Sequence, residues 1–362
     1  MNDLVVSIAH LLYAKHIGFC IYRLPSDNTF KIAVEHGILG IGSKKELLVK
    51  PFVPQSKGQE LTLDCLDDML SKGDVERIVQ DLKGIKSIEK EDLPKATAQS
   101  DYLKSFEHYM DAIESGVIKK AILSRVIRVE KPNKFEEIAC FEDLAATYSD
   151  AFVYLLAHPT SGTWLGATPE LLLRQKDSKA FVMALAGTQS RRDDSLYHWR
   201  DKEIDEHEMV GIHIKDVFFR HNYRLIHSNG PYSVEAGKVV HLRTDYMYDV
   251  SAQVNLKKLL EDLHPTPAVG GAPINEGVAC ILENEGYDRT YYSGIIGEID
   301  DDGNAQLYVN LRCMQVGENE IAVYVGGGIT KDSHPQEEWE ETVLKSKTLI
   351  DRIVQKFDMN KP

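Results

Sequence analysis

The sequence has 362 residues, a formal net charge of −14 at pH 7 and a hydrophobic content of 43%, which is enough for a large core. No run of Lys and Arg forms a basic stripe, which argues against binding to nucleic acid or to an anionic membrane surface. The five cysteines are scattered and lack CxxC spacing. This pattern argues against a disulfide framework or a zinc site and indicates a reducing, cytoplasmic compartment.

The N-terminal quarter of the chain contains no motif that indicates a chemistry. Residues 3–14 have helical periodicity, and 18–24, 30–34 and 46–50 are predicted strands. The first apolar run is short and follows Asp3 rather than lysines, so it predicts neither a signal peptide nor a membrane span. Residues 56–95 are highly charged, with a predicted helix at 66–85 and a linker before Lys95.

A predicted helix at residues 99–115 leads into a strand that begins near Lys119 and Lys120. Lys120 immediately precedes a strongly apolar run, which favours its burial. Burial disfavours an ammonium and favours the neutral amine, which can act as a base. The alternative is a lysine at a strand end that extends to water.

Glu170 follows a Gly–Ala–Thr–Pro turn, after the predicted strand at 151–157 and before a further apolar run. A carboxyl group enclosed by Leu171 and Leu172 would have a raised pKa and could donate a proton at neutral pH. The alternative is an ordinary solvated glutamate. Downstream, a predicted strand ends in the small residues Ala186 and Gly187, which leave space for a ligand or simply form a turn.

Residues 201–219 are predicted to form a long helix. Its buried stripe consists of His207, Val210, Ile214 and Val217. Two glutamates, at positions 203 and 206, lie beside this stripe. They fit either a solvated acidic first turn or a ligand set for a hard metal.

The C-terminal part of the chain contains three polar segments. The first, LHPTPAVGGAPINE, is predicted to be a rigid loop, and ENEGYDRTYYSGIIGEID follows. In the last, alternation over residues 307–312 predicts a strand that carries Arg312 on its polar face. A second strand, at 321–325, is predicted to lead into a loop at Gly326–Gly328, and Pro335 to open a helix with Glu338, Glu341 and Lys345 on one face. These charges are either a surface ion-pair pattern or the lining of an anion and metal pocket.

In order, HPTPAVGGAP, ENEGYDRTYYSGIIG, NLRCM, GGGIT and PQEEWEETVLK resemble the chorismate-utilising enzymes, which include isochorismate, salicylate and anthranilate synthases. The resemblance extends upstream to about Thr97. It implies an α+β fold: a single large domain of two facing antiparallel β-sheets, with helices outside and the site between the sheets. It also implies that residues 1–95 are a variable region packed on the same domain as the catalytic region, 96–362.

The resemblance implies a role for each matching position. Lys120, which precedes AILSR, matches the general base of the water-adding members, and Glu170 in GATPE matches the general acid. In EHEMV and the last helix, Glu206 and Glu341 match Mg²⁺ ligands, with Glu203 and Glu338 as supporting residues. The implied substrate-binding positions are Ala186, Gly187, Thr188, His241, Thr266, Ala268, Tyr292, Arg312, Gly326, Gly327, Gly328 and Lys345.

The expected reaction is the Mg²⁺-dependent, reversible conversion of chorismate to isochorismate. Amine-transferring relatives usually lack a lysine at the position of Lys120, and no glutaminase subunit is expected here. The HPTPAVGG loop favours stopping at isochorismate over the alternative, a salicylate synthase that also eliminates pyruvate. Menaquinone biosynthesis is the expected pathway, with a siderophore pathway as the alternative, and the protein is expected to be a monomer.

Overall fold

The computed structural model describes residues 2–38, 43–66, 73, 93–192, 196–236, 239–250 and 255–357. Its strands form one continuous hydrogen-bonded order, β10-β11-β9-β8-β14-β13-β3-β4-β2-β1-β6-β7-β15-β16-β5-β12. The pairings among the described strands are antiparallel, including those of consecutive strands such as β10–β11, β13–β14 and β15–β16. The structure confirms the expected α+β class and the single large domain.

The strands fall into three stretches of the chain. The N-terminal strands are β1 (Phe19–Arg23), β2 (Lys31–Glu35), β3 (Lys45–Lys50) and β4 (Leu61–Cys65). The middle strands are β5 (Lys120–Glu130), β6 (Phe152–His158), β7 (Gly162–Thr168), β8 (Leu171–Lys176), β9 (Lys179–Ser190), β10 (Arg224–Ala236) and β11 (Val239–Asp249). The C-terminal strands are β12 (Gly271–Ala272), β13 (Ile295–Asp300), β14 (Ala305–Val309), β15 (Cys313–Val316) and β16 (Glu320–Thr330).

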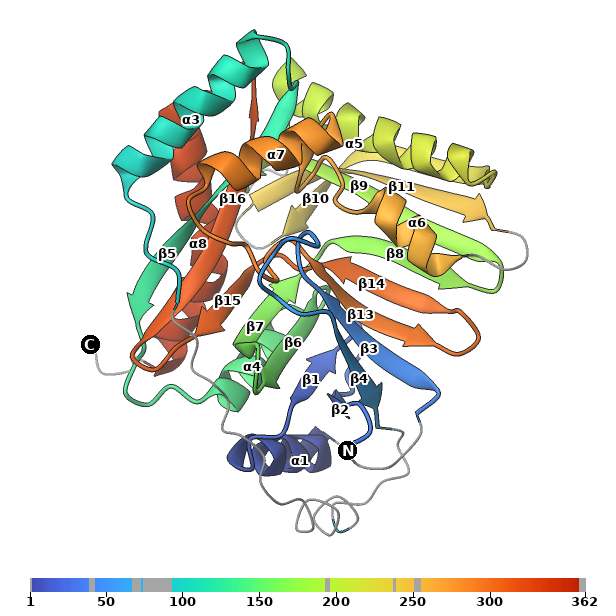
Figure 1. The fold of residues 1–362 in the computed structure, drawn as a ribbon, viewed down its shortest axis with the longest axis vertical. Helices are drawn as coiled ribbons and strands as arrows, with labels where there is room; N and C mark the ends of the chain where they lie inside the picture. The colour runs from blue at the N-terminus through green and yellow to red at the C-terminus, as the bar shows by residue number, and fades with distance from the viewer. Residues whose placement is uncertain are drawn as a thin grey trace.

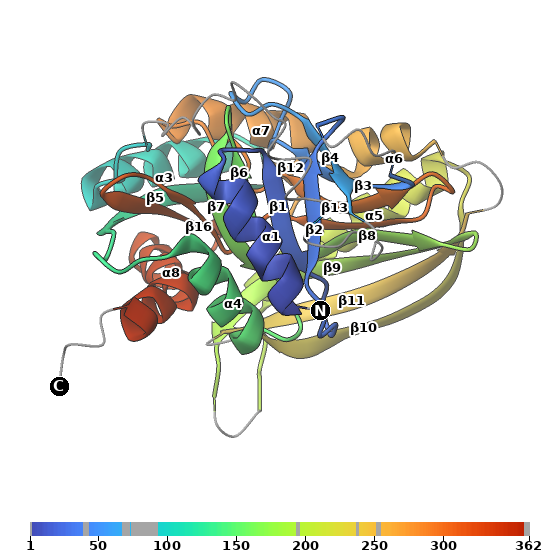
Figure 2. The ribbon, with the colours of Figure 1, turned by 90° about the horizontal axis from the view of Figure 1, so that it is seen from below.

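The helices cover the outer faces of the strands (Figures 1 and 2). They are α1 (Asn2–Ala14), α3 (Gln99–Glu114), α4 (Glu137–Thr147), α5 (Asp201–Arg220), α6 (Leu256–Leu263), α7 (Ile274–Asn284) and α8 (Pro335–Phe357). Helices α1 and α4 pack near β1, β6 and β7, α5 packs on β9 and β11, and α3 and α8 pack beside β5 and β16. No described helix is both long and apolar enough to cross a bilayer.

The two ends of the strand order face each other across the interior. Residues from β9 and β11, near one end, line the same cavity as residues from β16 and β5, near the other. The two facing sheets expected from the sequence are therefore the two halves of one continuous sheet, which folds over so that its ends face each other. Apolar side chains of α5 and β9, such as Val210 and Val182, form one of the core clusters behind this cavity.

The predictions for most elements are confirmed, including α1, β1, β2, β3, α3, β5, β6 and α5 with its buried stripe. The sequence reasoning did not identify β4 and did not resolve β10 as a separate strand. The helix predicted at 66–85 lies almost entirely outside the described residues.

Two predictions about the C-terminal strands are wrong. Gly326, Gly327 and Gly328 form no loop, because they belong to β16 and pair in register with Ser124, Leu123 and Ile122 of β5. The predicted strand at 307–312 ends at Val309, and Arg312 has a positive φ of 49° between β14 and β15. This break turns the Arg312 side chain out of the strand alternation.

Candidate active site

A small cavity lies between the two ends of the strand order and has a volume of about 80 Å³. All but one of the predicted substrate-binding positions line it. They are Ala186, Gly187, Thr188, His241, Ala268, Tyr292, Arg312, Gly326, Gly327, Gly328 and Lys345. The exception is Thr266, which is buried behind the wall, where its Oγ1 accepts a hydrogen bond of 3.3 Å from the Ala268 N–H.

A second cavity, of about 530 Å³, adjoins the first. The two share Pro169, Leu185, His241 and Arg312, so these side chains form the partition between them. The second cavity also contacts Tyr148 and Thr348, on the side of α4 and α8.

Arg312 and His241 form a fixed pair in this partition. The Arg312 guanidinium donates to Thr348 Oγ1 at 2.9 Å and to His241 Nε2 at 3.3 Å. Burial and the adjacent Arg312 charge lower the pKa of His241 to about 3, so its ring is neutral. Because Nε2 accepts from Arg312, the ring proton lies on Nδ1, which is 3.2 Å from the Gly187 carbonyl oxygen. Because the His241 ring is neutral and only accepts a hydrogen bond, the positive charge of Arg312 stays available to bind an anion.

Glu170 is a buried carboxyl group in the cavity wall, directly after β7. Burial raises its pKa to about 7, against the opposing charges of Lys120, Lys345 and Arg312. A carboxyl group with this pKa is protonated in a substantial fraction of molecules at neutral pH. It can therefore act as the predicted proton donor.

Lys120 is fully buried at the start of β5, and its Nζ lies 2.9 Å from Glu206 Oε1 on α5. The predicted burial of Lys120 is confirmed. Burial alone would raise the pKa of Glu206, but Lys120, Lys202 and Lys345 outweigh it and lower that pKa. Lys120, the expected base, and Glu206, an expected metal ligand, therefore form an ion pair beside the cavity.

Glu338 and Glu341 approach the same place from α8. A Cβ at Gly327 would lie 3.2 Å from Glu338 Oε2 and 3.4 Å from Glu341 Oε1. Glu338 is almost completely buried and forms an ion pair with Lys202 of α5, and Glu341 Oε1 lies 2.7 Å from Lys345 Nζ. Burial and the neighbouring Glu341 charge raise the pKa of Glu338 to about 7.

Glu203 has a different role from the other three glutamates. Its carboxylate accepts hydrogen bonds from the Arg200 backbone N–H at 3.0 Å and from the Arg200 side chain at 2.6 Å. This arrangement caps the first turn of α5. The structure therefore brings together Glu206, Glu338 and Glu341 and places Glu203 at the helix end.

The glycines of β16 explain how charged groups can approach a strand so closely. A Cβ at Gly328 would lie only 2.3 Å from Glu206 Oε1 and 2.8 Å from Lys120 Cε. At Gly187, which has a φ of 76°, a Cβ would lie 3.1 Å from the Glu203 carbonyl oxygen. Side chains at these positions would displace the very groups that the sequence predicted to be functional.

The sequence reasoning missed Lys202 and the apolar walls of the cavity. Pro169, Leu185, Val269 and Tyr324 line the cavity, and Tyr292 stacks on Tyr324 with ring centroids 5.5 Å apart. Lys202 precedes Glu206 by one helical turn, and this i, i+4 spacing was the available signal that the two side chains share a face.

The three glutamates carry the ligand type that a hard divalent cation takes, and their oxygens would have to move closer together to bind one ion. Glu338 is buried, the neighbouring Glu341 charge helps to raise its pKa, and carboxylate oxygens are the ligands that Mg²⁺ prefers. Glu206, Glu338 and Glu341 would supply these ligands.

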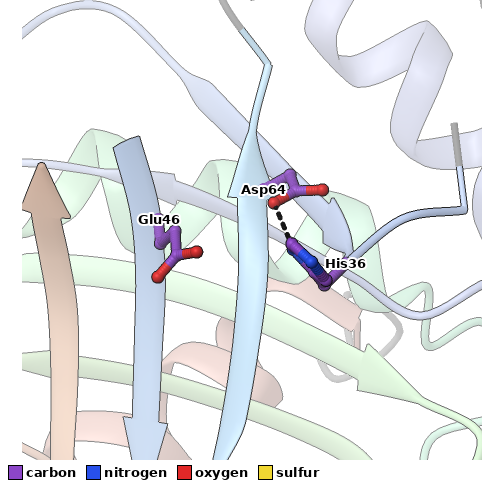
Figure 3. Close-up of side chains that lie close together, drawn as sticks. All are labelled: His36, Glu46 and Asp64. Carbon is purple, nitrogen blue, oxygen red and sulfur yellow. Dashed lines mark hydrogen bonds and ion pairs between the residues drawn. The ribbon is translucent and has the colours of Figure 1, made fainter. Parts of the chain in front are cut away.

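A separate group with metal-binding side chains lies on the N-terminal strands. Among the described residues, His36, Glu46 and Asp64 alone place three potential ligand atoms within 4.8 Å of one another (Figure 3). Asp64 Oδ1 lies 2.8 Å from His36 Nδ1, and Asp64 Oδ2 accepts a 3.0 Å hydrogen bond from the Gly37 N–H. The hydrogen bond to Asp64 raises the pKa of His36, so an ion pair between an exposed histidine and a buried aspartate accounts for this group, which does not line the cavity.

Sequence comparison identifies proteins that are similar to this chain. The family described as chorismate binding enzyme matches residues 57–354. Isochorismate synthase EntC of Escherichia coli K12 is 30% identical over 241 residues, which cover 64% of this chain and 62% of EntC. Isochorismate synthase MenF of Bacillus subtilis is 28% identical over 265 residues, which cover 70% of this chain and 56% of MenF. The chain thus spans less than two thirds of these relatives.

Structural comparison covers more of the chain. The crystal structure of DhbC from Bacillus anthracis has a TM-score of 0.74 and 22% identity, over 96% of this chain and 99% of DhbC. MenF from Escherichia coli has a TM-score of 0.73 and 19% identity, over 93% of this chain and 88% of MenF. These likenesses show a shared fold. Because the family match spans most of the sequence, the chain belongs to the family of chorismate-binding enzymes.

Proposed function

We propose that this protein is an isochorismate synthase, which converts chorismate reversibly to isochorismate with Mg²⁺. The observation that carries the proposal is the pair formed by Glu170, a buried carboxyl group with a pKa of about 7, and Lys120, a fully buried lysine beside the same cavity. Addition of water at one ring carbon and loss of hydroxide from another needs a base and an acid of this kind.

The substrate is held by its two carboxylates. Arg312, Tyr292 and the backbone around Gly326–Gly328 would hold the enolpyruvyl carboxylate, because a guanidinium and backbone N–H groups are strong donors to anions. Glu206, Glu338 and Glu341 would hold Mg²⁺, which when bound supplies positive charge for the ring carboxylate.

Lys120 removes a proton from the water molecule whose oxygen forms the bond to C2. The double bond shifts, the C4–O bond breaks, and Glu170 donates its proton to the departing hydroxide, which leaves as water. In the reverse direction the two residues exchange roles. No ammonia or glutaminase subunit takes part. Menaquinone biosynthesis is the expected destination of the product, with a siderophore pathway as the alternative. Five free, buried cysteines support a cytoplasmic location.

A product assay tests the reaction. Purified protein with chorismate and Mg²⁺, without ammonia, should give isochorismate in equilibrium with chorismate, resolved by chromatography. Salicylate with pyruvate would instead identify a salicylate synthase. An aminated product that forms only with ammonia would contradict the role of Lys120.

The same assay tests the base. Lys120→Ala should lower kcat by about 10²- to 10⁴-fold, the usual contribution of one acid–base group. Lys120→Gln should do the same while it still offers Glu206 a hydrogen bond. Lys119→Ala, which alters the exposed neighbour, is the matched control and should retain activity. Full turnover by the Lys120 variants would exclude this residue as the base.

A further inference from the structure

The three glutamates of the candidate metal site each pair with a different lysine. Glu206 pairs with Lys120 at 2.9 Å, Glu341 pairs with Lys345 at 2.7 Å, and Glu338 pairs with Lys202. The three glutamates and the three lysines therefore match one for one. Lysine side chains of the protein therefore lie beside the carboxylates of the candidate metal site.

The three lysines are not equivalent. Lys345 lies on the same helix as Glu341 and also donates to the Gly326 carbonyl oxygen at 2.9 Å. Lys120 is the candidate base. Lys202 has no assigned role. It connects α5 to α8 through Glu338, which lies 136 positions later in the sequence.

The Lys202–Glu338 pair is also well shielded from solvent. The side chain of Lys202 is 11% exposed and that of Glu338 is 2% exposed. By contrast, the Arg200–Glu337 pair between the same helices spans 3.6 Å and both of its side chains are largely exposed. A shielded ion pair resists separation much more than an exposed one, because a lone buried charge is costly.

A metal ion cannot use all three carboxylates as they stand. In the described part of the chain, the oxygens of Glu206, Glu338 and Glu341 do not all come within 4.8 Å of one another. Oxygens bound to one Mg²⁺ at 2.0–2.1 Å lie no more than about 4.2 Å apart. At least one of these carboxylates must therefore move before all three can bind one ion, and the ammonium of Lys202 holds the carboxylate of Glu338 in its present place.

We propose that Lys202 is a built-in counter-cation that competes with Mg²⁺ for Glu338. In the absence of Mg²⁺ it neutralises Glu338 and holds α5 against α8. A bound Mg²⁺ would supply this positive charge instead, and the Lys202 ammonium would then withdraw from Glu338. This inference rests on the proposed function, because it assumes that the three glutamates hold the metal.

The test compares Lys202→Met with the parent protein, using Mg²⁺ alone as the probe. Isothermal titration calorimetry should show Mg²⁺ binding about ten-fold more tightly to the variant, because a competing charge is gone and a tenfold change in affinity corresponds to about 1.4 kcal/mol. In EDTA the variant should unfold at a lower temperature, because Glu338 loses its counter-charge. Addition of Mg²⁺ should raise Tm more in the variant than in the parent.

Matched controls separate local charge from net charge. Lys215→Met removes one exposed positive charge from the same helix and should leave Mg²⁺ affinity and both Tm values unchanged. Lys202→Arg retains the cation and should leave Mg²⁺ binding at or below the parent affinity. If Lys202→Met does not fold, Lys202→Gln, which keeps a neutral donor for Glu338, should still bind Mg²⁺ more tightly.

The outcomes distinguish this inference from the proposed function. If the parent binds Mg²⁺ and the Lys202→Met or Lys202→Gln variant binds it equally or more weakly, Lys202 supports the metal site and the competition is disproved. If the parent protein binds no Mg²⁺ even with chorismate present, the metal-dependent function itself fails.

Discussion

At the scale of single residues, burial in the cavity wall shifts the protonation equilibria of ionisable groups away from those in water. Glu170 is the clearest case, because its pKa of about 7 results from burial that three nearby cations only partly offset. Such a group is a good proton donor and a poor contributor to stability. Function and stability therefore make opposite demands on this one carboxyl group.

Glu170→Gln should separate these two demands. The pKa of Glu170 in the folded protein lies above its ordinary value of 4.5, so folding takes up a proton between pH 4.5 and about 7. Stability is therefore lost progressively as pH rises through this range, by up to about 3 kcal/mol above pH 7. The Gln variant should lose turnover, unfold at a higher temperature than the parent at pH 8, and match the parent near pH 4.5.

Thermal melts across this pH range, with kinetics at pH 7, would check both effects. Glu340→Gln, an exposed change on α8, serves as the control and should alter neither quantity. A variant that is no more stable than the parent at pH 8 would show that Glu170 is not held in an unfavourable ionised state.

At the scale of elements, β16 shows what sequence reasoning can and cannot predict. The strand predicted at 321–325 is confirmed, and Pro335 correctly predicted the start of α8. The three glycines were predicted to form a loop, because glycine is usually read as a break. Here, instead, pairing with β5 over the whole length of β16 extends the strand through them.

The positions of the functional residues were predictable only in part. The ordered motifs identified most of the cavity wall, because each is a local pattern in the sequence. The ion pair between Lys202 and Glu338 joins residues 136 positions apart and could not be predicted from either segment alone. The break at Arg312 depends on the paths of β14 and β15 and likewise has no local signal.

Gly328→Ala and Gly327→Ala form a graded test of β16. At Gly328 the new Cβ would lie 2.3 Å from Glu206 Oε1, so the Glu206–Lys120 pair must shift, and kcat should fall by at least about 10²-fold. At Gly327 the nearest atom is Glu338 Oε2 at 3.2 Å, which can give way. The second variant should therefore retain more activity.

Steady-state kinetics and circular dichroism on both glycine variants would check this order. Equal activity of the two, with native spectra, would mean that the closeness of Glu206 and Lys120 to β16 has no catalytic importance.

At the scale of the whole molecule, the N-terminal strands are internal to the strand order. β1 pairs with β6, and β3 pairs with β13, so β1 to β4 lie between the two halves that face each other across the cavity. In Figure 1 the blue N-terminal strands lie between the green and orange ones. The region without functional motifs is therefore a structural bridge.

Removing residues 1–66 should prevent folding of the remainder. The deletion would leave β6 and β13 as unpaired edges in the middle of the sheet, and unpaired edges promote aggregation. We expect insoluble protein on expression, or a spectrum without native content. A soluble truncated protein with native circular dichroism and cooperative unfolding would show that the halves associate without this bridge.

The small volume of the inner cavity has a consequence for the timing of ligand capture. At about 80 Å³ it is smaller than the 300–1,000 Å³ typical of small-molecule sites, so a substrate would need the partition toward the adjoining cavity of about 530 Å³ to move. The measured affinity then equals the intrinsic affinity reduced by the fraction of molecules that are open. The opening rate of the cavity wall, rather than diffusion, would then limit the association rate constant. A substitution far from any charged group could tighten binding by raising the fraction of molecules in the open form.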